Sequence, residues 1–306
     1  MSDSREKQLR ISEAVDLAHA LVASVAEQAG IRALFIKGPI SQRLGLRPTR
    51  QSSDVDALVD PERRDEIVAD LVRLGWHKRT MWEEGHLFPL HAVNLIHSEW
   101  PCDLDLHDRY PGFFREKQEA FEILWHHKFE ARIANKDVFA PDLVASSLIA
   151  AAHSARHPNQ SRTKSEFPFL LAAVRNEFTA EQRTEVVAMA GELRALETLR
   201  MFLREAGADT DIKDLTSGER RLWRMSIADD SRSLGWLLQI GLASWHERPG
   251  LVLRALIPSS EQMRAIHPET GPGRSGLWCA RLKRLFHGTK AVPRAIAHYL
   301  GNRNAK

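Results

Sequence analysis

Three aspartates on two short apolar segments are the residues of this sequence best suited to chemistry. Asp54 and Asp56 alternate with apolar residues in 53–59, and Asp105 lies in 102–107, which has the same alternation. Side chains at positions i and i+2 of a strand project from one face, so Asp54 and Asp56 are expected to point the same way. Their oxygen atoms suit Mg²⁺, which binds one or two carboxylates together with substrate phosphates. With Asp105 as a third carboxylate, the pattern predicts metal-assisted phosphoryl chemistry, in which two Mg²⁺ ions brace the attacking and leaving oxygens.

The segment 102–107 contains two candidates for the third carboxylate. Asp103 and Asp105 are two positions apart and therefore share a strand face, so either could complete the set. We favour Asp105, because it begins the sequence D-L-H. His107 lies on the same face, where contact with the substrate and a purely structural role are equally compatible with the sequence. Asp103 is a further candidate for substrate contact.

A glycine turn precedes the aspartate pair. Residues 33–38 are typical of a short buried strand that runs into a turn at Gly38, and Pro39 suits the first position of a helix over about 40–45. The free backbone N–H groups at a helix N-terminus favour phosphate groups. Pro39 removes one of these donors, so side chains are expected to contribute to nucleotide binding. The candidates near the turn and the aspartate pair are Lys37, Gly38, Ser41, Arg50 and Ser53.

These motifs together resemble the nucleotidyltransferase superfamily of DNA polymerase β type. The resemblance is carried by the Lys37-Gly38 turn, the run R-x-x-S-D-V-D-A-L-V at 50–59 and the D-L-H at 105–107. More narrowly, the chain resembles the bacterial "uncharacterised nucleotidyltransferase" family. Its members also have a Pro-[DE] helix that ends in H-x-x-x-H and a late P-S-x-x-x-[LM]-[RK] element, which correspond here to 141–157 and 258–264.

The resemblance, which spans about residues 12–300, implies a Mg²⁺-dependent enzyme. It would transfer a nucleoside monophosphate from a nucleoside triphosphate such as ATP to an unidentified hydroxyl or phosphate acceptor and release pyrophosphate. Asp54, Asp56 and Asp105 would hold the metal ions, and Asp105 would help to deprotonate the acceptor hydroxyl. One departure from the superfamily is Pro39, because Gly-Ser or Gly-Gly is usual at the turn. The alternative is a non-catalytic member that binds nucleotide, nucleic acid or protein and uses the same fold as a scaffold.

Strand-like patterns are concentrated in the first part of the chain. Residues 1–115 are expected to form a small mixed-sheet, nucleotidyltransferase-like α/β domain and residues 116–306 a mainly helical domain, which makes the fold class α+β. Pro111-Gly112 marks the expected boundary. In the helical domain, helices are predicted at 116–127, 141–157, 167–175, 180–206, 218–226, 232–245, 259–265 and 278–286.

The composition is that of a globular chain. Of the 306 residues, 43% are hydrophobic and 27% are charged, which excludes a disordered protein. The sequence contains no run of about 18 apolar residues, so we expect a cytoplasmic protein without membrane contact. The two cysteines, Cys102 and Cys279, have no metal-ligand spacing.

Charge is distributed unevenly along the chain. Residues 274–306 contain eight Lys or Arg and no Asp or Glu, so all 40 acidic residues precede this basic tail. The tail is expected to dock on the acidic body of the protein. Contact with a nucleic acid or another polyanion is the alternative.

Overall fold

The computed structural model describes most of the chain. The described residues are 9–79, 91–158, 160–208, 212–228, 240, 243–260, 263, 275–283, 285 and 286. The chain divides into two compact units, one of residues 1–79 with 91–215 and one of residues 80–90 with 216–306.

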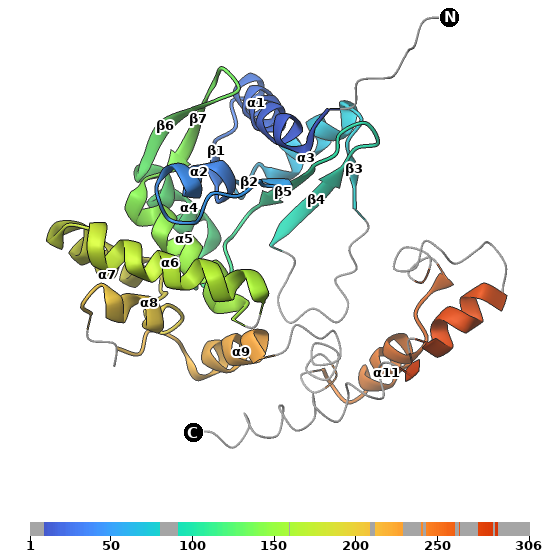
Figure 1. Ribbon diagram of the computed structural model, residues 1–306. Coiled ribbons are helices and arrows are strands. Elements are labelled where there is room, and N and C mark those ends of the chain that lie inside the picture. Colours follow the sequence, from blue (N-terminus) through green and yellow to red (C-terminus); the bar gives the residue numbers. More distant parts are fainter. Residues whose placement is uncertain are drawn as a thin grey trace, which may run out of the picture. The chain divides into compact units, whose positions relative to one another are not determined.

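A five-stranded mixed sheet forms the centre of the first unit (Figure 1). Its strand order is β1-β2-β5-β4-β3, in which β2 and β5 pair in parallel and the other neighbours are antiparallel. The strands are β1 (Ala33–Ile36), β2 (Asp54–Val59), β3 (His77–Lys78), β4 (Ala92–Ile96) and β5 (Asp103–His107). The parallel pair β2–β5 joins the two segments that carry the predicted aspartates.

One face of this sheet packs against α1 (Ile11–Ala29) and α3 (Arg64–Arg73). Val55 of β2 and Leu104 of β5 are fully buried in the apolar core that these two helices share with the sheet. α1 ends as predicted at Gly30, whose φ of 62° is the left-handed conformation that glycine adopts without strain. This apolar face therefore supplies the burial that holds β2 and β5 in place.

The opposite face of the sheet is divided between apolar and acidic residues. Leu34, Ile36 and Leu58 pack in a second core against helices that follow in the chain. These helices are α4 (Lys117–His126), α5 (Leu143–Arg156), α6 (Ser161–Glu177), α7 (Ala180–Glu192) and α8 (Arg200–Glu205). The aspartates of β2 and β5 alternate onto this same face. A short helix, α2 (Gly38–Arg43), leads from β1 toward it.

The structure contains a hairpin that the sequence analysis did not predict. β6 (Lys128–Ile133) and β7 (Lys136–Pro141) are joined at Ala134 and Asn135, which both have positive φ. Apolar and charged residues do alternate along β6, but the turn lacks the Asn-Gly or Asp-Gly that usually marks a two-residue hairpin. The apolar side of the hairpin packs into the core that contains α1.

The single helix expected over 180–206 is divided into α7 and α8. Arg194 between them has a φ of 52°, and the Asp214 carboxylate accepts hydrogen bonds from the backbone N–H groups of Leu196 and Glu197 at 2.8 and 3.1 Å. Because this cap comes from a residue far along the chain, helical periodicity alone could not predict the division.

The second unit is helical in its described residues, which include α9 (Ser217–Ala228) and α11 (Arg248–Leu256). The expected helices at 232–245 and 259–265 lie mostly outside the described residues, as does most of the basic tail. Within the described parts of the chain, no helix is long and apolar enough to cross a membrane. The mixed sheet and the many helices confirm the predicted α+β fold class, whereas the division at about residue 115 stays a prediction.

Candidate active site

Strand register brings the predicted aspartates to one region of the sheet. In the parallel pair β2–β5, Asp54 lies opposite Asp103 and Asp56 lies opposite Asp105. The antiparallel pair β4–β5 adds Asn94 opposite Asp105. Residues that face each other across neighbouring strands project from the same side, so these five polar residues share one face.

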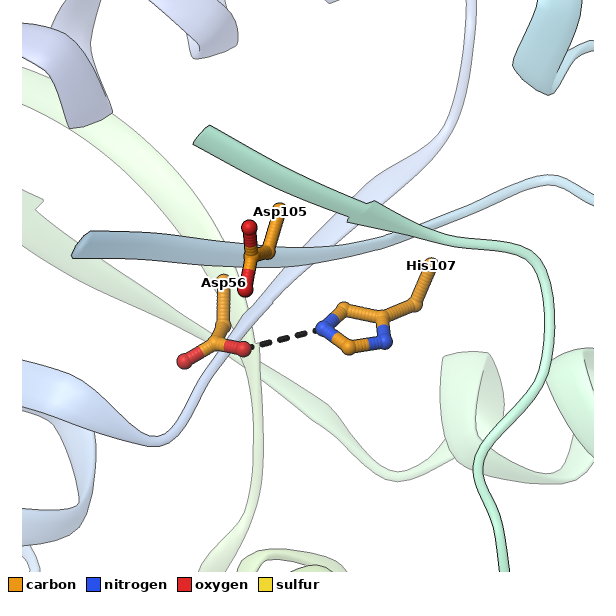
Figure 2. A group of neighbouring side chains, drawn as sticks. All are labelled: Asp56, Asp105 and His107. Carbon is orange, nitrogen blue, oxygen red and sulfur yellow. Dashed lines mark hydrogen bonds and ion pairs between the residues drawn. The ribbon is translucent and has the colours of Figure 1, made fainter. Parts of the chain in front are cut away.

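Asp56, Asp105 and His107 form the compact centre of this face (Figure 2). One potential ligand atom from each of the three lies within 4.8 Å of the other two. His107 Nε2 is 2.9 Å from Asp56 Oδ1, which also accepts a hydrogen bond from Lys37 Nζ at 2.6 Å. Asp105 Oδ1 accepts a hydrogen bond from the side-chain amide of Asn94. The centre is thus a pair of carboxylates with a histidine and a lysine directed at one of them.

The two carboxylates of the centre have opposite electrostatic environments. Burial raises the pKa of Asp56, but the Lys37 ammonium and the His107 hydrogen bond outweigh it and hold that pKa well below its usual range. Burial, followed by the negative charges of Asp56 and Asp54, raises the pKa of Asp105 to about 7. Burial and the charge of Asp56 also raise the pKa of Asp54. The positive charge near the centre therefore compensates Asp56 and leaves Asp105 and Asp54 undercompensated.

His107 serves Asp56 as a neutral hydrogen-bond donor. Its side chain is 3% exposed, and burial lowers its pKa, so the ring donates from Nε2 to Asp56. Nδ1 then remains a buried acceptor, with no partner among the residues that the structure describes. The Tyr110 ring lies beside His107, with 6.1 Å between ring centroids, and the Lys37 ammonium lies 5.4 Å from the centre of the Tyr110 ring. This packing limits how far Lys37 and His107 can turn away from Asp56.

The backbone at Lys37 is in an unusual conformation. Lys37 has φ 58° and ψ −147°, a region that a residue with a long side chain rarely adopts. Gly38, with φ 47°, continues the turn, and a Cβ added there would lie 3.5 Å from Ser52 Oγ. Strain of this kind costs about 1–3 kcal/mol per residue and is concentrated at functional sites. The turn directs Lys37 to Asp56, and Pro39 follows within the first turn of α2.

Two of the other predicted site residues, Arg50 and Asp103, have ion-pair partners of their own. Arg50 Nε donates to Glu166 Oε1 of α6 at 2.6 Å, and Asp103 accepts from Arg79 at 2.6 Å. Ser41 is buried on α2, and Ser53 is exposed directly before β2. The structure thus brings Asp105, and not Asp103, into the group with Asp56. The roles of all these residues in binding and catalysis stay predictions.

Sequence reasoning missed Asn94 and Glu166, and it preferred Arg50 to Arg47, which could equally have been a surface charge. Asn94 is the side chain paired with Asp105, and Glu166 is the partner of Arg50. Arg47 is 7% exposed and hydrogen bonds to Ser52. None of them belongs to a local motif. The contacts of Asn94 and Glu166 depend on strand pairing and helix packing, so the sequence carried no direct signal for them. The contact of Arg47 with Ser52 is local, and it is the burial of Arg47 that the sequence does not show.

A second group of three potential ligands lies away from the sheet. His127, Asp142 and Glu185 are partly exposed, and His127 Nδ1 is 3.2 Å from Asp142 and 3.4 Å from Glu185. Asp142 is also the N-cap of α5 and accepts from the backbone N–H of Ala145 at 2.9 Å. Helix capping and ion pairing account for this group without a ligand. The predicted H-x-x-x-H pair, His153 and His157, has ring centroids 5.6 Å apart.

No protein-family model matches the chain, and no curated protein matches it in sequence. Similar solved structures include an antigenic nucleotidyltransferase-like protein from Paracoccidioides brasiliensis, with 11% identity over 63% of this chain and 94% of that chain and a TM-score of 0.39. The antibiotic-resistance factor ANT(2'')-Ia has 16% identity over 59% of this chain and 91% of that chain, with a TM-score of 0.39. The lincosamide antibiotic adenylyltransferase LnuA has 13% identity over 51% of this chain and 94% of that chain, with a TM-score of 0.34. At these values, function has to be argued from the site.

Proposed function

We propose that this chain is a metal-dependent nucleotidyltransferase. It transfers a nucleoside monophosphate from a nucleoside triphosphate, such as ATP, to a hydroxyl or phosphate acceptor. The observation that carries the proposal is the pairing of Asp56 with Asp105 across β2 and β5, with donor atoms within 4.8 Å of each other and of His107. Two carboxylates this close on a rigid sheet are a costly arrangement unless a cation is shared between them.

The donor set fits a hard divalent cation. Asp56 and Asp105 would supply oxygen ligands from adjacent strands. Asp54 shares their face but lies outside the group of atoms within 4.8 Å of one another, and it would supply a third ligand. The raised pKa of Asp105, about 7, marks a negative charge that the described neighbours leave undercompensated and that Mg²⁺ would compensate. We propose two Mg²⁺ ions, which when bound neutralise the triphosphate and acidify the acceptor hydroxyl. His107 donates to Asp56 and so orients this ligand from the other side.

The protein residues have separate tasks in the proposed reaction. The acceptor oxygen forms a bond to the α-phosphorus, the bond from that phosphorus to the bridging oxygen breaks, and pyrophosphate leaves. Asp105 takes the proton of the acceptor hydroxyl, because neither Lys37 nor His107 bonds to its carboxylate, whereas both bond to Asp56. Lys37 and His107 keep Asp56 ionised and fixed in orientation. Most of the catalysis is positioning and electrostatics.

Several finer features belong to the same proposal. We assign the chain to the bacterial "uncharacterised nucleotidyltransferase" family and to the cytoplasm, and we propose that residues 116–306 select the acceptor. For the basic tail, contact with a polyanion stays the alternative to docking on the acidic body. A non-catalytic scaffold is not favoured. A scaffold does not require an ionised Asp56 next to Asp105. Here a strained Lys37 and a buried His107 both bond to Asp56 and keep it ionised.

A binding experiment separates the enzyme from the scaffold. We would titrate ATP by calorimetry with and without Mg²⁺ into the wild-type protein and into Asp56→Asn and Asp105→Asn. The enzyme predicts binding that depends on Mg²⁺ and is lost in both variants. Asp65→Asn is the matched control, because its side chain is 81% exposed on α3. ATP binding that is the same with and without Mg²⁺, and the same in both variants as in the wild type, would instead support the scaffold.

A labelling experiment then identifies the acceptor. The purified protein is incubated with each α-³²P-labelled nucleoside triphosphate and a cell extract, and the labelled product is isolated. Label in a product made by wild-type protein and absent with Asp105→Asn supports nucleotidyl transfer. The absence of any Asp105-dependent labelled product with all four nucleotides would contradict it.

A further inference from the structure

His107 has a hydrogen bond at only one of its two ring nitrogens in the part of the chain that the structure describes. Its Nε2 lies 2.9 Å from Asp56 Oδ1 (Figure 2). Its Nδ1 is buried and has no hydrogen-bond partner among the described residues. In most functional histidines, the hydrogen bond of one nitrogen fixes the tautomer and orientation in which the other acts. Because that bond is lacking here, the side chains packed against the ring must orient His107.

The His91 ring packs against His107. The two ring centroids are 5.4 Å apart with 30° between the ring planes, and Tyr110 is a further ring neighbour of His107 at 6.1 Å. His91 comes directly before β4, where Ala92 lies opposite His107, and its carbonyl oxygen accepts a hydrogen bond from the backbone N–H of Asp108 at 3.1 Å. Strand pairing therefore places the His91 ring beside His107 but does not decide how that ring is turned.

Arg156 decides how the His91 ring is turned. It is the last residue of α5, and its Nη1 lies 3.0 Å from His91 Nε2. A guanidinium group only donates, so Nε2 must be the acceptor, and the proton of the neutral His91 ring is on Nδ1. Burial holds the pKa of His91 well below its usual range, which keeps this ring neutral. The two packed rings therefore have opposite tautomers, with the proton on Nδ1 in His91 and on Nε2 in His107.

Helix α5 gives Arg156 a fixed base. Leu148 and Ala152 of this helix are fully buried in the second core, which holds the helix against the sheet. The last turn of α5 also carries the predicted H-x-x-x-H segment at 153–157, in which Arg156 lies between the two histidines. A continuous row of contacts thus runs from α5 through Arg156 and the two rings of the strands to Asp56.

We propose that Arg156 and His91 are positioning residues of the carboxylate centre. Arg156 fixes the tautomer and orientation of His91, and His91 holds His107 in the orientation that donates to Asp56. The proposal rests on the proposed function only for its effect on catalysis, because the contacts themselves require no substrate.

The consequence for the centre is a fixed Asp56 carboxylate. Lys37 and His107 both bond to its Oδ1, and they hold Oδ2 directed away from them. If His107 turns away, Lys37 alone holds this carboxylate, which can then rotate about a single contact. Residues that orient a metal ligand in this way change the affinity of the site for its cation when they are replaced. Arg156 and His91 are therefore expected to affect cation binding without touching the cation.

The first test determines the ring tautomers by ¹⁵N NMR of protein labelled at histidine, without metal and at pH 8, where both rings are neutral. In the wild type we expect the proton on Nδ1 of His91 and on Nε2 of His107. Arg156→Met removes the donor but keeps an unbranched side chain, so the His91 tautomer should become mixed and a His107 form protonated on Nδ1 should appear. Arg156→Lys keeps a donor and should retain the wild-type tautomers. Arg175→Met is the matched control, because this arginine of α6 is paired with Glu205 and is 61% exposed.

The second test measures the affinity for Mn²⁺ by electron paramagnetic resonance, with thermal unfolding of each variant on the same preparation. We expect a loss of about 10-fold in Arg156→Met and in His91→Ala, the lower end of the effect of residues behind a metal ligand. Adding Arg156→Met to His91→Ala should cause no further loss, because Arg156 acts through His91. Arg156→Lys and Arg175→Met should bind Mn²⁺ like the wild type.

Three results would overturn the proposal: a His91 ring protonated on Nε2 in the wild type, an Arg156→Met variant with unchanged His107 tautomer and Mn²⁺ affinity, or an equal loss of affinity in Arg175→Met. A further loss when Arg156→Met is added to His91→Ala would also contradict it. Wild-type protein that does not bind Mn²⁺ would reject the proposed function, and the tautomers would then decide the proposal alone. Tautomers that depend on Arg156 in a protein that transfers no nucleotide would keep the positioning role and reject the enzyme.

Discussion

The two faces of strand β5 differ in almost every physical respect, although they alternate residue by residue. Leu104 and Leu106 are fully buried on the side of α1 and α3. Asp103 and Asp105 lie on the other side, opposite Asp54 and Asp56. The first face buries apolar surface and so contributes to the free energy of folding. The second gathers negative charge, which opposes folding.

The difference shows how one strand can serve both stability and chemistry. Because neighbouring residues point to opposite faces, a substitution at Leu104 and one at Asp105 should change different properties of the protein. On the acidic face, burial, followed by the charges of Asp56 and Asp54, raises the pKa of Asp105 to about 7, and Lys37, which bonds to Asp56, compensates it only in part. Such a site lowers the free energy of unfolding, and the burial of the apolar face offsets this loss of stability.

The largest effect is expected on the acidic face, in Asp105→Asn. Removing a carboxylate that braces the reacting groups should lower the rate of nucleotidyl transfer by about 1,000-fold, or roughly 4 kcal/mol. The melting temperature without metal should stay the same or rise, since Asp105 is repelled by Asp56 and Asp54. Activity and thermal unfolding are measured on one preparation, with Asp65→Asn as the control. A lower melting temperature with a proportional loss of activity would show that Asp105 is structural.

The next effect belongs to the apolar face, in Leu104→Ala. A fully buried leucine replaced by alanine should lower the free energy of unfolding by about 2–5 kcal/mol. Denaturant unfolding measures this loss. Activity per folded molecule should stay unchanged, because the side chain points away from the carboxylates. If Leu104→Ala instead lowers the rate for the folded fraction, the two faces are not independent.

A buried histidine on the apolar side gives a pH-dependent effect. His19 of α1 is 1% exposed and lies against Phe35 of β1, and burial lowers its pKa from 6.5. As the pH falls through 6.5, His19 therefore binds a proton in the unfolded chain but not in the folded protein. The contribution of His19 to the free energy of unfolding is constant above pH 6.5. Below pH 6.5 it lowers the free energy of unfolding by up to about 1.4 kcal/mol per pH unit.

Unfolding free energies from pH 5 to pH 8 measure this contribution of His19. In His19→Gln, the loss of stability below pH 6.5 should be smaller than in the wild type, because one proton fewer is taken up on unfolding. Equal slopes for the two proteins would mean that His19 is protonated in the folded state.

The smallest effect is expected at the second group of potential ligands, where Asp142 caps α5. Asp142→Ala should lower the free energy of unfolding by about 1 kcal/mol, whereas Asp142→Asn should keep most of the cap. Neither should change the rate of nucleotidyl transfer or the binding of Mn²⁺, followed by its electron paramagnetic resonance signal. Mn²⁺ binding lost in Asp142→Asn but kept in Asp56→Asn would reverse the assignment of the two groups.

Local patterns were sufficient for the strands that carry the aspartates and for the first helix, although not for the β6–β7 hairpin or the division between α7 and α8. The period of two in 53–59 and 102–107 predicted strands with aspartates on one face, and β2 and β5 confirm both strands. The helical spacing before Gly30 predicted α1. These properties depend on residues within a few positions of each other, which is why they can be read without a tertiary structure.

Only the tertiary structure decided which of these residues meet. Register between β2 and β5 brings Asp105 into the group with Asp56, although Asp103 has the same local pattern. Packing of α6 joins Arg50 to Glu166, which is 116 positions away, and leaves Arg47 buried beside a pocket. Strand register and helix packing are set by the burial of apolar side chains distant in sequence. The sequence by itself therefore determined that Asp54 and Asp56 project from one face of a strand. The fold determined which carboxylate of the neighbouring strand and which basic side chains lie next to them.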